Sequence, residues 1–192
     1  VAEGERVVAA PCTVGVGTPG SLSPRTGLLR GSNSVELNGC ALDRLLAARL
    51  ARPVRIANDA NCFALSEATD GAGQGAASVF GVILGTGVGG GLVIDGRIVV
   101  GRHAIAGEWG HNPLPWMTPQ EQAEVSDCYC GKQGCIETWL SGPGIARHAE
   151  RRLGPVDGRE LATRAQAGDA AANAEIMRVA DRLARALACV IN

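Results

Sequence analysis

One histidine and three cysteines in the segment 105–142 have the types and the spacing of zinc ligands. Sixteen residues separate His111 from Cys128, one residue separates Cys128 from Cys130, and four residues separate Cys130 from Cys135. Thiolate sulfur and imidazole nitrogen are the ligands that Zn²⁺ prefers in closed tetrahedral sites. Four protein ligands leave no open position for a reactive water, so we predict a structural zinc that holds a loop. Unrelated thiols are the alternative, and a disulfide is disfavoured because Cys-x-Cys is too short for easy bridging geometry.

Two carboxylates lie next to the predicted zinc ligands. Glu108 is close to His111 in the sequence, and Glu137 is close to Cys135. A loop closed by zinc therefore brings two carboxylates and an imidazole into one place. We expect a polar ligand to bind there.

Asp59 is a further candidate, because it follows a predicted strand directly. Residues 54–58 read VRIAN and predict a buried strand, and residues 60–70 predict a helix. In open α/β sheets, ligands bind at the carboxyl ends of the strands. Asp59 could act there as a general base, or it could only cap the helix, which Asp does well. The local residues alone favour capping slightly.

A glycine-rich segment, GTGVGGG at residues 85–91, connects predicted strands at 78–84 and 92–94. Such a turn exposes backbone N–H groups that can hold phosphate oxygens. The following Asp95-Gly96 pair predicts a type I′ hairpin to a strand at 97–100. A hairpin in place of a helix excludes a Rossmann loop, and the missing Lys-Ser/Thr excludes a Walker A loop. A purely structural hairpin remains the alternative.

Hydrophobic periodicity and turn residues predict the other elements. Asn33 and Asn38 lie in a turn-rich segment, where they either recognise a ligand or form Asx turns. We expect further strands at 6–10, 12–16 and 27–30 and helices at 42–50, 143–152, 159–167 and 170–192.

Composition excludes several classes of protein. Apolar residues make up 46% of the 192 residues, and the net charge is −1, so neither nucleic acid nor a membrane surface is favoured as a partner. We find no run of eighteen apolar residues and no signal-peptide pattern. Free cysteines in a metal-like cluster fit a reducing cytoplasm. The start at Val1, in place of Met, and the uncapped apolar end at Asn192 predict a fragment of a longer protein.

Taken together and in this order, NDAN, GTGVGGG, GEWGHNPLP and CYCGKQGCIE resemble the sugar kinases of the ROK family over essentially the whole chain. The resemblance implies an α/β chain with the actin/hexokinase-like (ribonuclease-H-like) fold, a central mixed sheet flanked by helices and a zinc-clipped loop. Residues 1–58 would be the remainder of the N-terminal subdomain, and residues 59–192 the start of a truncated C-terminal subdomain. The motifs look most similar to the bacterial fructokinase branch and next to the N-acetylglucosamine kinases.

The resemblance also implies roles for single residues. Asp59 matches the catalytic base, which reverses the preference for capping, and ATP with Mg²⁺ would supply the phosphoryl group. His111 would bind both zinc and sugar. The implied sugar ligands are Gly20, Asn33, Asn58, Glu108, His111 and Glu137, and the implied phosphate-binding residues are Gly85, Thr86, Gly87, Gly89 and Gly90.

The chain also departs from the family pattern. The opening Asp-x-Gly-Gly-Thr phosphate loop and the closing glycine-rich adenosine motif are missing from these residues, so the fragment itself is expected to be inactive. Fructose is the hexose expected first, with N-acetylglucosamine or glucose as alternatives, and the protein is expected to be a cytoplasmic homodimer. Two other functions remain as alternatives. The chain could be part of a sugar-sensing ROK repressor without catalysis, or an interaction domain that zinc holds together.

Overall fold

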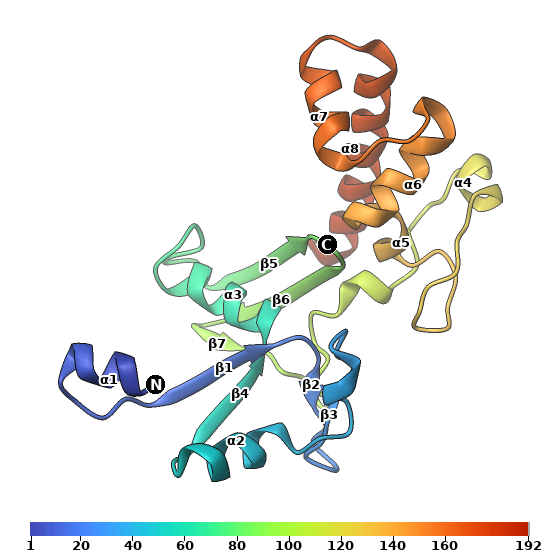
Figure 1. Cartoon of the computed structure of the whole chain (residues 1–192). Coiled ribbons are helices and arrows are strands. Elements are labelled where there is room, and N and C mark those ends of the chain that lie inside the picture. The colour runs from blue at the N-terminus through green and yellow to red at the C-terminus, as the bar shows by residue number, and fades with distance from the viewer. Residues whose placement is uncertain (192) are drawn as a thin grey trace. The chain divides into compact units, whose positions relative to one another are not determined.

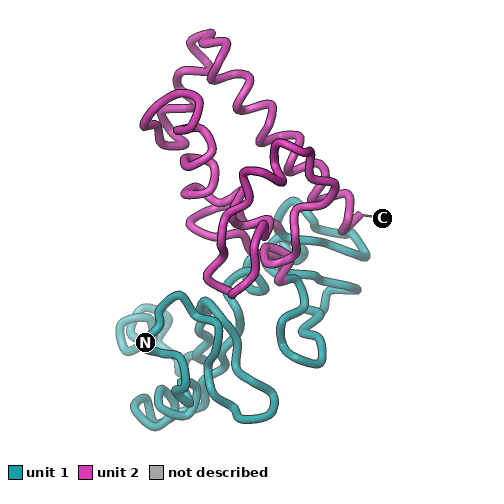
Figure 2. Tube along the Cα trace, turned by 90° about the vertical axis from the view of Figure 1, so that its right-hand side faces the viewer, with its two compact units in different colours: residues 1–81, 91–107 teal, residues 82–90, 108–192 magenta. Residues whose placement is uncertain are grey.

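The computed structural model describes residues 1–191, which form two compact units (Figures 1 and 2). The first unit comprises residues 1–81 and 91–107, and the second comprises residues 82–90 and 108–192. The boundary predicted after residue 58 lies inside the first unit. In the described part of the chain, no helix is both long and apolar enough to cross a bilayer.

The first unit is built around a pair of parallel strands. β1 (Val14–Thr18) pairs with β4 (Val54–Asn58) in a register that places Thr18 opposite Asn58. The chain reaches β4 through α2 (Leu42–Leu50) and leaves it directly into α3 (Asp59–Thr69). The carboxyl ends of both strands therefore meet at one edge, as the sequence predicted for Asp59. Between β1 and α2 lie β2 (Ser21–Leu22), β3 (Leu29–Arg30) and the short 3₁₀ helix η1 (Val35–Leu37).

The strand predicted at residues 6–10 was wrong, because the chain begins with helix α1 (Ala2–Val8). Two β-branched residues, Val7 and Val8, suggested a strand. The helix instead gains from acidic residues in its first turn and from Arg6 in its last turn, where both charge signs suit the helix dipole. Glu5 of the same helix also forms an ion pair with Arg52.

A hairpin connects the two units in the sequence. It consists of β5 (Ser78–Leu84) and β6 (Val88–Ile94), and β7 (Arg97–Ile98) pairs with β6. Asp95 and Gly96 both have positive φ, 49° and 71°, which confirms the predicted type I′ turn. Within the described residues, the strands form three small sheets in place of one, with both parallel and antiparallel pairs.

Helix α3 packs closely on this hairpin through glycine. A side chain at Gly91 would place its Cβ 2.7 Å from the Ala60 carbonyl oxygen and 2.8 Å from the Ala64 Cβ. Only glycine allows this approach, so the start of α3, which carries Asp59, is held against β6.

The second unit is largely helical. α6 (Gly142–Leu153), α7 (Gly158–Gln166) and α8 (Ala170–Ile191) pack around Ala149, Val156, Leu161 and Ala172. These helices agree with the predicted ones within a few residues. The segment before them contains η2 (Trp109–His111), α4 (Pro119–Ala123) and α5 (Ile136–Leu140).

Candidate functional site

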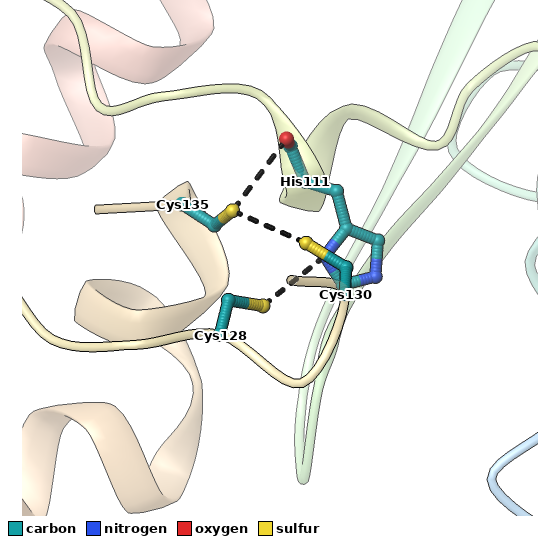
Figure 3. Close-up of side chains that lie close together, drawn as sticks. All are labelled: His111, Cys128, Cys130 and Cys135. Atoms are coloured by element: carbon teal, nitrogen blue, oxygen red, sulfur yellow. Dashed lines mark hydrogen bonds between the residues drawn. The ribbon is translucent and has the colours of Figure 1, made fainter. Parts of the chain in front are cut away.

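The four predicted zinc ligands come together in the second unit (Figure 3). The ligand atoms of His111, Cys128, Cys130 and Cys135 all lie within 4.8 Å of one another. Cys128 Sγ is 3.5 Å from His111 Nδ1, and Cys130 Sγ is 3.6 Å from Cys135 Sγ. A tetrahedral zinc with ordinary bond lengths separates two sulfurs by about 3.8 Å and a sulfur from a nitrogen by about 3.6 Å. The donor set therefore fits zinc in both type and spacing.

Backbone hydrogen bonds shape this cluster before any metal is considered. The Cys128 N–H donates to the Lys132 carbonyl, and the Gly131 N–H donates to the Cys128 carbonyl, which makes a tight turn around Cys130. The Ile136 N–H donates to the Asn112 carbonyl at 2.8 Å and so fixes the base of the loop beside His111. The loop is thus arranged to present three sulfurs toward one imidazole.

Burial and neighbouring groups make two of the thiols weak acids without a metal. Burial, followed by hydrogen bonds from Cys130 and Cys128, raises the pKa of Cys135 to about 12. Burial also raises the pKa of Cys128. Zinc must therefore displace protons when it binds, because the thiolate is the form that ligates.

Glu137 of α5 reaches the glycine-rich turn within the same unit. Its Oε2 accepts a hydrogen bond of 3.0 Å from the Val88 N–H. A Cβ at Gly87 would lie 2.8 Å from that oxygen, so a larger residue there would require the carboxylate to shift. A second hydrogen bond also holds the turn in place: the Gly142 N–H donates to the Gly85 carbonyl at 2.7 Å. A predicted sugar ligand and the predicted phosphate turn are therefore in direct contact.

The turn itself is shorter than the glycine motif. Gly85, Thr86 and Gly87 connect the two strands, and Gly85 and Thr86 are exposed. Gly89 and Gly90 lie inside β6, where the Gly89 carbonyl accepts a hydrogen bond from the Trp109 indole. Residues 85–87 are thus the part of the predicted phosphate-binding motif that forms the turn.

Trp139 fixes the helix that carries Glu137. It is fully buried, stacks on His148 with ring centroids 4.1 Å apart, and lies 4.7 Å from the Arg182 guanidinium. Burial, then the nearby charges of Arg182 and Arg151, lowers the pKa of His148 to about 4, so its ring is neutral at pH 7. The position of Glu137 thus depends on packing as well as on the adjacent Cys135.

The predicted residues of the first unit gather at the carboxyl ends of β1 and β4. Asn58 is the N-cap of α3: its Oδ1 accepts the Asn61 N–H at 3.1 Å, and its amide donates to the Gly20 carbonyl at 3.2 Å. Asp59 is exposed, and its Oδ1 accepts a hydrogen bond from the adjacent Ala60 N–H at 2.9 Å. Asn58 therefore performs the capping that was one of the two roles predicted for Asp59.

The two asparagines of the turn-rich segment differ. The side chain of Asn38 exchanges two hydrogen bonds with the backbone of Ser32, at 3.0 and 2.9 Å, and so has the structural role that the sequence left open. Asn33 is exposed beside it, and its role in sugar binding stays a prediction.

The contact between Tyr129 and His111 was not predicted from the sequence. The Tyr129 hydroxyl lies 3.0 Å from His111 Nε2. Tyr129 is the single tyrosine of the chain and stands between two predicted zinc ligands, so its place in the motif was the available signal.

Comparisons with known proteins agree with these motifs. A family model described as the ROK family matches residues 1–192. The N-acetyl-D-glucosamine kinase of Escherichia coli O6:H1 is 40% identical over all of this chain, which covers 64% of that protein. The ROK hexokinase of Thermus thermophilus is 33% identical, with a TM-score of 0.83 over 99% of this chain and 62% of that one.

A ROK transcriptional regulator, a homologue of the E. coli MLC protein, also has a similar structure. It is 26% identical, with a TM-score of 0.81 over 100% of this chain and 50% of that one. The chain thus spans about half to two thirds of the length of the relatives it matches. The actin/hexokinase-like α/β fold predicted from the sequence is confirmed.

Proposed function

The chain belongs to the ROK family, and we propose that it is part of a kinase that transfers the γ-phosphoryl group of ATP to a hydroxyl of a hexose. The observation that carries this proposal is the placement of Asp59. It is exposed at the carboxyl end of a parallel strand, and Asn58 already caps the helix that follows. A carboxylate that is not needed as a cap is free to accept a proton.

In the proposed reaction, Asp59 takes the proton from the attacking sugar hydroxyl as its oxygen forms a bond to the γ-phosphorus. The bond from that phosphorus to the bridging oxygen breaks, and ADP leaves. Carboxylates serve this purpose in kinases generally, while positioning and charge stabilisation lower most of the barrier. Mg²⁺ bound to ATP would neutralise phosphate charge. The exposed turn at residues 85–87 would position the phosphates.

The sugar would be recognised by fixed polar groups. Within the unit that holds the metal cluster, these groups are Glu108, His111 and Glu137. Such groups discriminate against a sugar that lacks a matching hydroxyl, because they would then be desolvated without a partner. Zinc would be structural, since four protein ligands complete its coordination.

We place N-acetylglucosamine first among the candidate sugars. The motifs alone favoured fructose, but the relatives with 40–48% identity are named N-acetyl-D-glucosamine kinases. Fructose, glucose and mannose complete the panel for an ATP-coupled assay of the full-length protein. A cytoplasmic location and a homodimer remain part of this proposal.

The test of the mechanism is Asp59→Asn in the full-length protein. We expect kcat to fall by about a hundred- to ten-thousand-fold, because an amide cannot take the proton. The melting temperature should hardly change, since Asn58 still caps the helix. Asp70→Asn, the same change at the C-terminal end of the same helix, is the matched control and should keep its rate. A fully active Asp59→Asn enzyme would refute the general-base role.

A sugar sensor is the second candidate, because the ROK transcriptional regulator matches the whole chain. A sensor would bind sugar without turnover. Sugar binding by the wild-type full-length protein without phosphorylation of any panel member would favour this candidate over the kinase.

A further inference from the structure

Tyr129 contacts the imidazole that the proposed function assigns to both zinc and sugar. Its hydroxyl is 3.0 Å from His111 Nε2, and the two rings meet edge to face with centroids 5.1 Å apart. The Tyr129 side chain is otherwise mostly exposed, at 79%. Its hydroxyl end is thus directed to the site, while most of its ring faces solvent.

The two ring nitrogens of His111 have separate tasks. Nδ1 lies 3.5 Å from Cys128 Sγ and so faces the metal cluster. A metal on Nδ1 uses the lone pair of that nitrogen, so the remaining proton must be on Nε2. His111 therefore has one N–H to donate on its outer side, and the Tyr129 oxygen is placed to accept it.

We propose that the Tyr129 hydroxyl competes with the sugar for this single N–H and thereby sets the affinity of the site. The inference depends on the proposed function, since it takes His111 as a sugar ligand. A sugar hydroxyl that binds His111 must first displace Tyr129. A sugar that lacks a hydroxyl at this point cannot replace the lost hydrogen bond and is selected against.

The surroundings of Tyr129 agree with this exchange. The charges of Glu137 and Glu108, the other proposed sugar ligands of this unit, act on its hydroxyl. The hydroxyl therefore lies among the groups that a sugar hydroxyl would meet.

The exchange needs only a side-chain rotation. Both neighbours of Tyr129 in the sequence, Cys128 and Cys130, are predicted zinc ligands and hold the backbone in place. The ring is already largely in water, so turning it outward exposes little further apolar surface.

The test compares zinc-loaded wild type with Tyr129→Phe by isothermal titration with each sugar of the panel, in the full-length protein without nucleotide. We expect Tyr129→Phe to bind its preferred sugar about two- to tenfold more tightly, the equivalent of one hydrogen bond. The zinc content should be unchanged. In the kinase assay, KM for sugar should fall while kcat stays the same. Glu108→Gln is the opposite control and should weaken sugar binding.

The outcomes separate this inference from the proposed function. Equal or weaker sugar binding by Tyr129→Phe, with sugar binding by the wild type, overturns the competition and leaves the kinase proposal intact. Failure of both proteins to bind any sugar overturns the proposed function and this inference with it. Faster solvent exchange of the His111 Nε2–H in zinc-loaded Tyr129→Phe, measured by NMR without sugar, would support the hydrogen bond itself, and unchanged exchange would argue against it.

Discussion

Two clusters in the second unit fasten the same segment, residues 112–135, in different ways. The first cluster, His111 with three cysteines, joins the two ends of this segment and is arranged for a metal ion. The second cluster lies inside the segment, where Glu121 of α4 accepts hydrogen bonds from Arg182 and Arg185 of α8, with distances of 2.8–3.0 Å. The metal ligands are 24 residues apart at most, whereas Glu121 and its partners are separated by 61 and 64 residues. The first cluster shapes a loop, and the second ties that loop to a distant helix.

The energetics of the two clusters also differ. Binding of a structural zinc adds directly to the free energy of folding. A buried ion pair must first offset the loss of hydration of both charges, so its net gain is small, but the loss of one partner is severe. Glu121 shows how complete this pairing is. Burial acts to raise its pKa, but hydrogen bonds from Arg182, the Thr118 N–H and Arg185 lower it to about 2.

The largest effect should follow the loss of a zinc ligand. Cys135 is fully buried, and Cys135→Ser replaces a thiolate with a poor zinc ligand. We expect zinc to be lost and the melting temperature to fall by on the order of 10 to 20 °C. Metal analysis and thermal unfolding measure both. Cys62→Ser, at an exposed position outside the cluster, should keep its zinc and its stability. Full zinc occupancy in Cys135→Ser would remove the cluster as a metal site.

Loss of the ion-pair partner should come next. Glu121→Gln keeps the shape but removes the nearer of the two carboxylates that pair with the buried Arg182, at 2.9 Å, and leaves only Glu175, at 3.7 Å. We expect the free energy of unfolding to fall by about 3–5 kcal/mol, measured by urea denaturation. Glu150→Gln on the exposed face of α6 should change it by less than about 0.5 kcal/mol. Zinc should stay bound in Glu121→Gln, and its loss would show that the two clusters do not act independently.

The smallest effect concerns the local cap beside the ion pair. Thr118 and Glu121 form a capping box at the start of α4, in which each side chain accepts the backbone N–H of the other residue. Thr118→Ala removes one acceptor and should cost about 1 kcal/mol. Thr163→Ala, at an exposed position in α7, is the matched control and should be close to neutral. A cost for Thr118→Ala as large as that of Glu121→Gln would mean that the cap, and not the ion pair, holds this helix.

The same comparison explains what could be predicted from the sequence. The candidate zinc ligands and the Asn58–Asp59 pair could be predicted because their signal lies in short spacing or at the end of one apolar strand. The pairing of Glu121 with Arg182 depends on how α4 and α8 pack, so no local sequence pattern predicts it. The contact of Glu137 with the glycine-rich turn was missed for the same reason.

Errors in the predicted elements have a similar origin. Val7 and Val8 suggested a strand, but the helix there also makes an ion pair between Glu5 and Arg52, which is remote in the sequence. Asn38 could not be assigned from its turn-rich segment alone, because its partner groups are the backbone atoms of Ser32. Local propensity thus gave the kind of element in most places, while tertiary contacts decided the exceptions.

In the proposed kinase, the hydrogen bond from the Val88 N–H to Glu137 would couple sugar binding to phosphate binding. Oε2 of Glu137 holds the glycine-rich turn, and the proposed function assigns the same carboxylate to the sugar. A ligand on the carboxylate that strengthens or weakens this hydrogen bond changes the free energy of the turn, and a phosphate on the turn acts back on the carboxylate. Because such coupling is reciprocal, each ligand must alter the affinity for the other by the same factor.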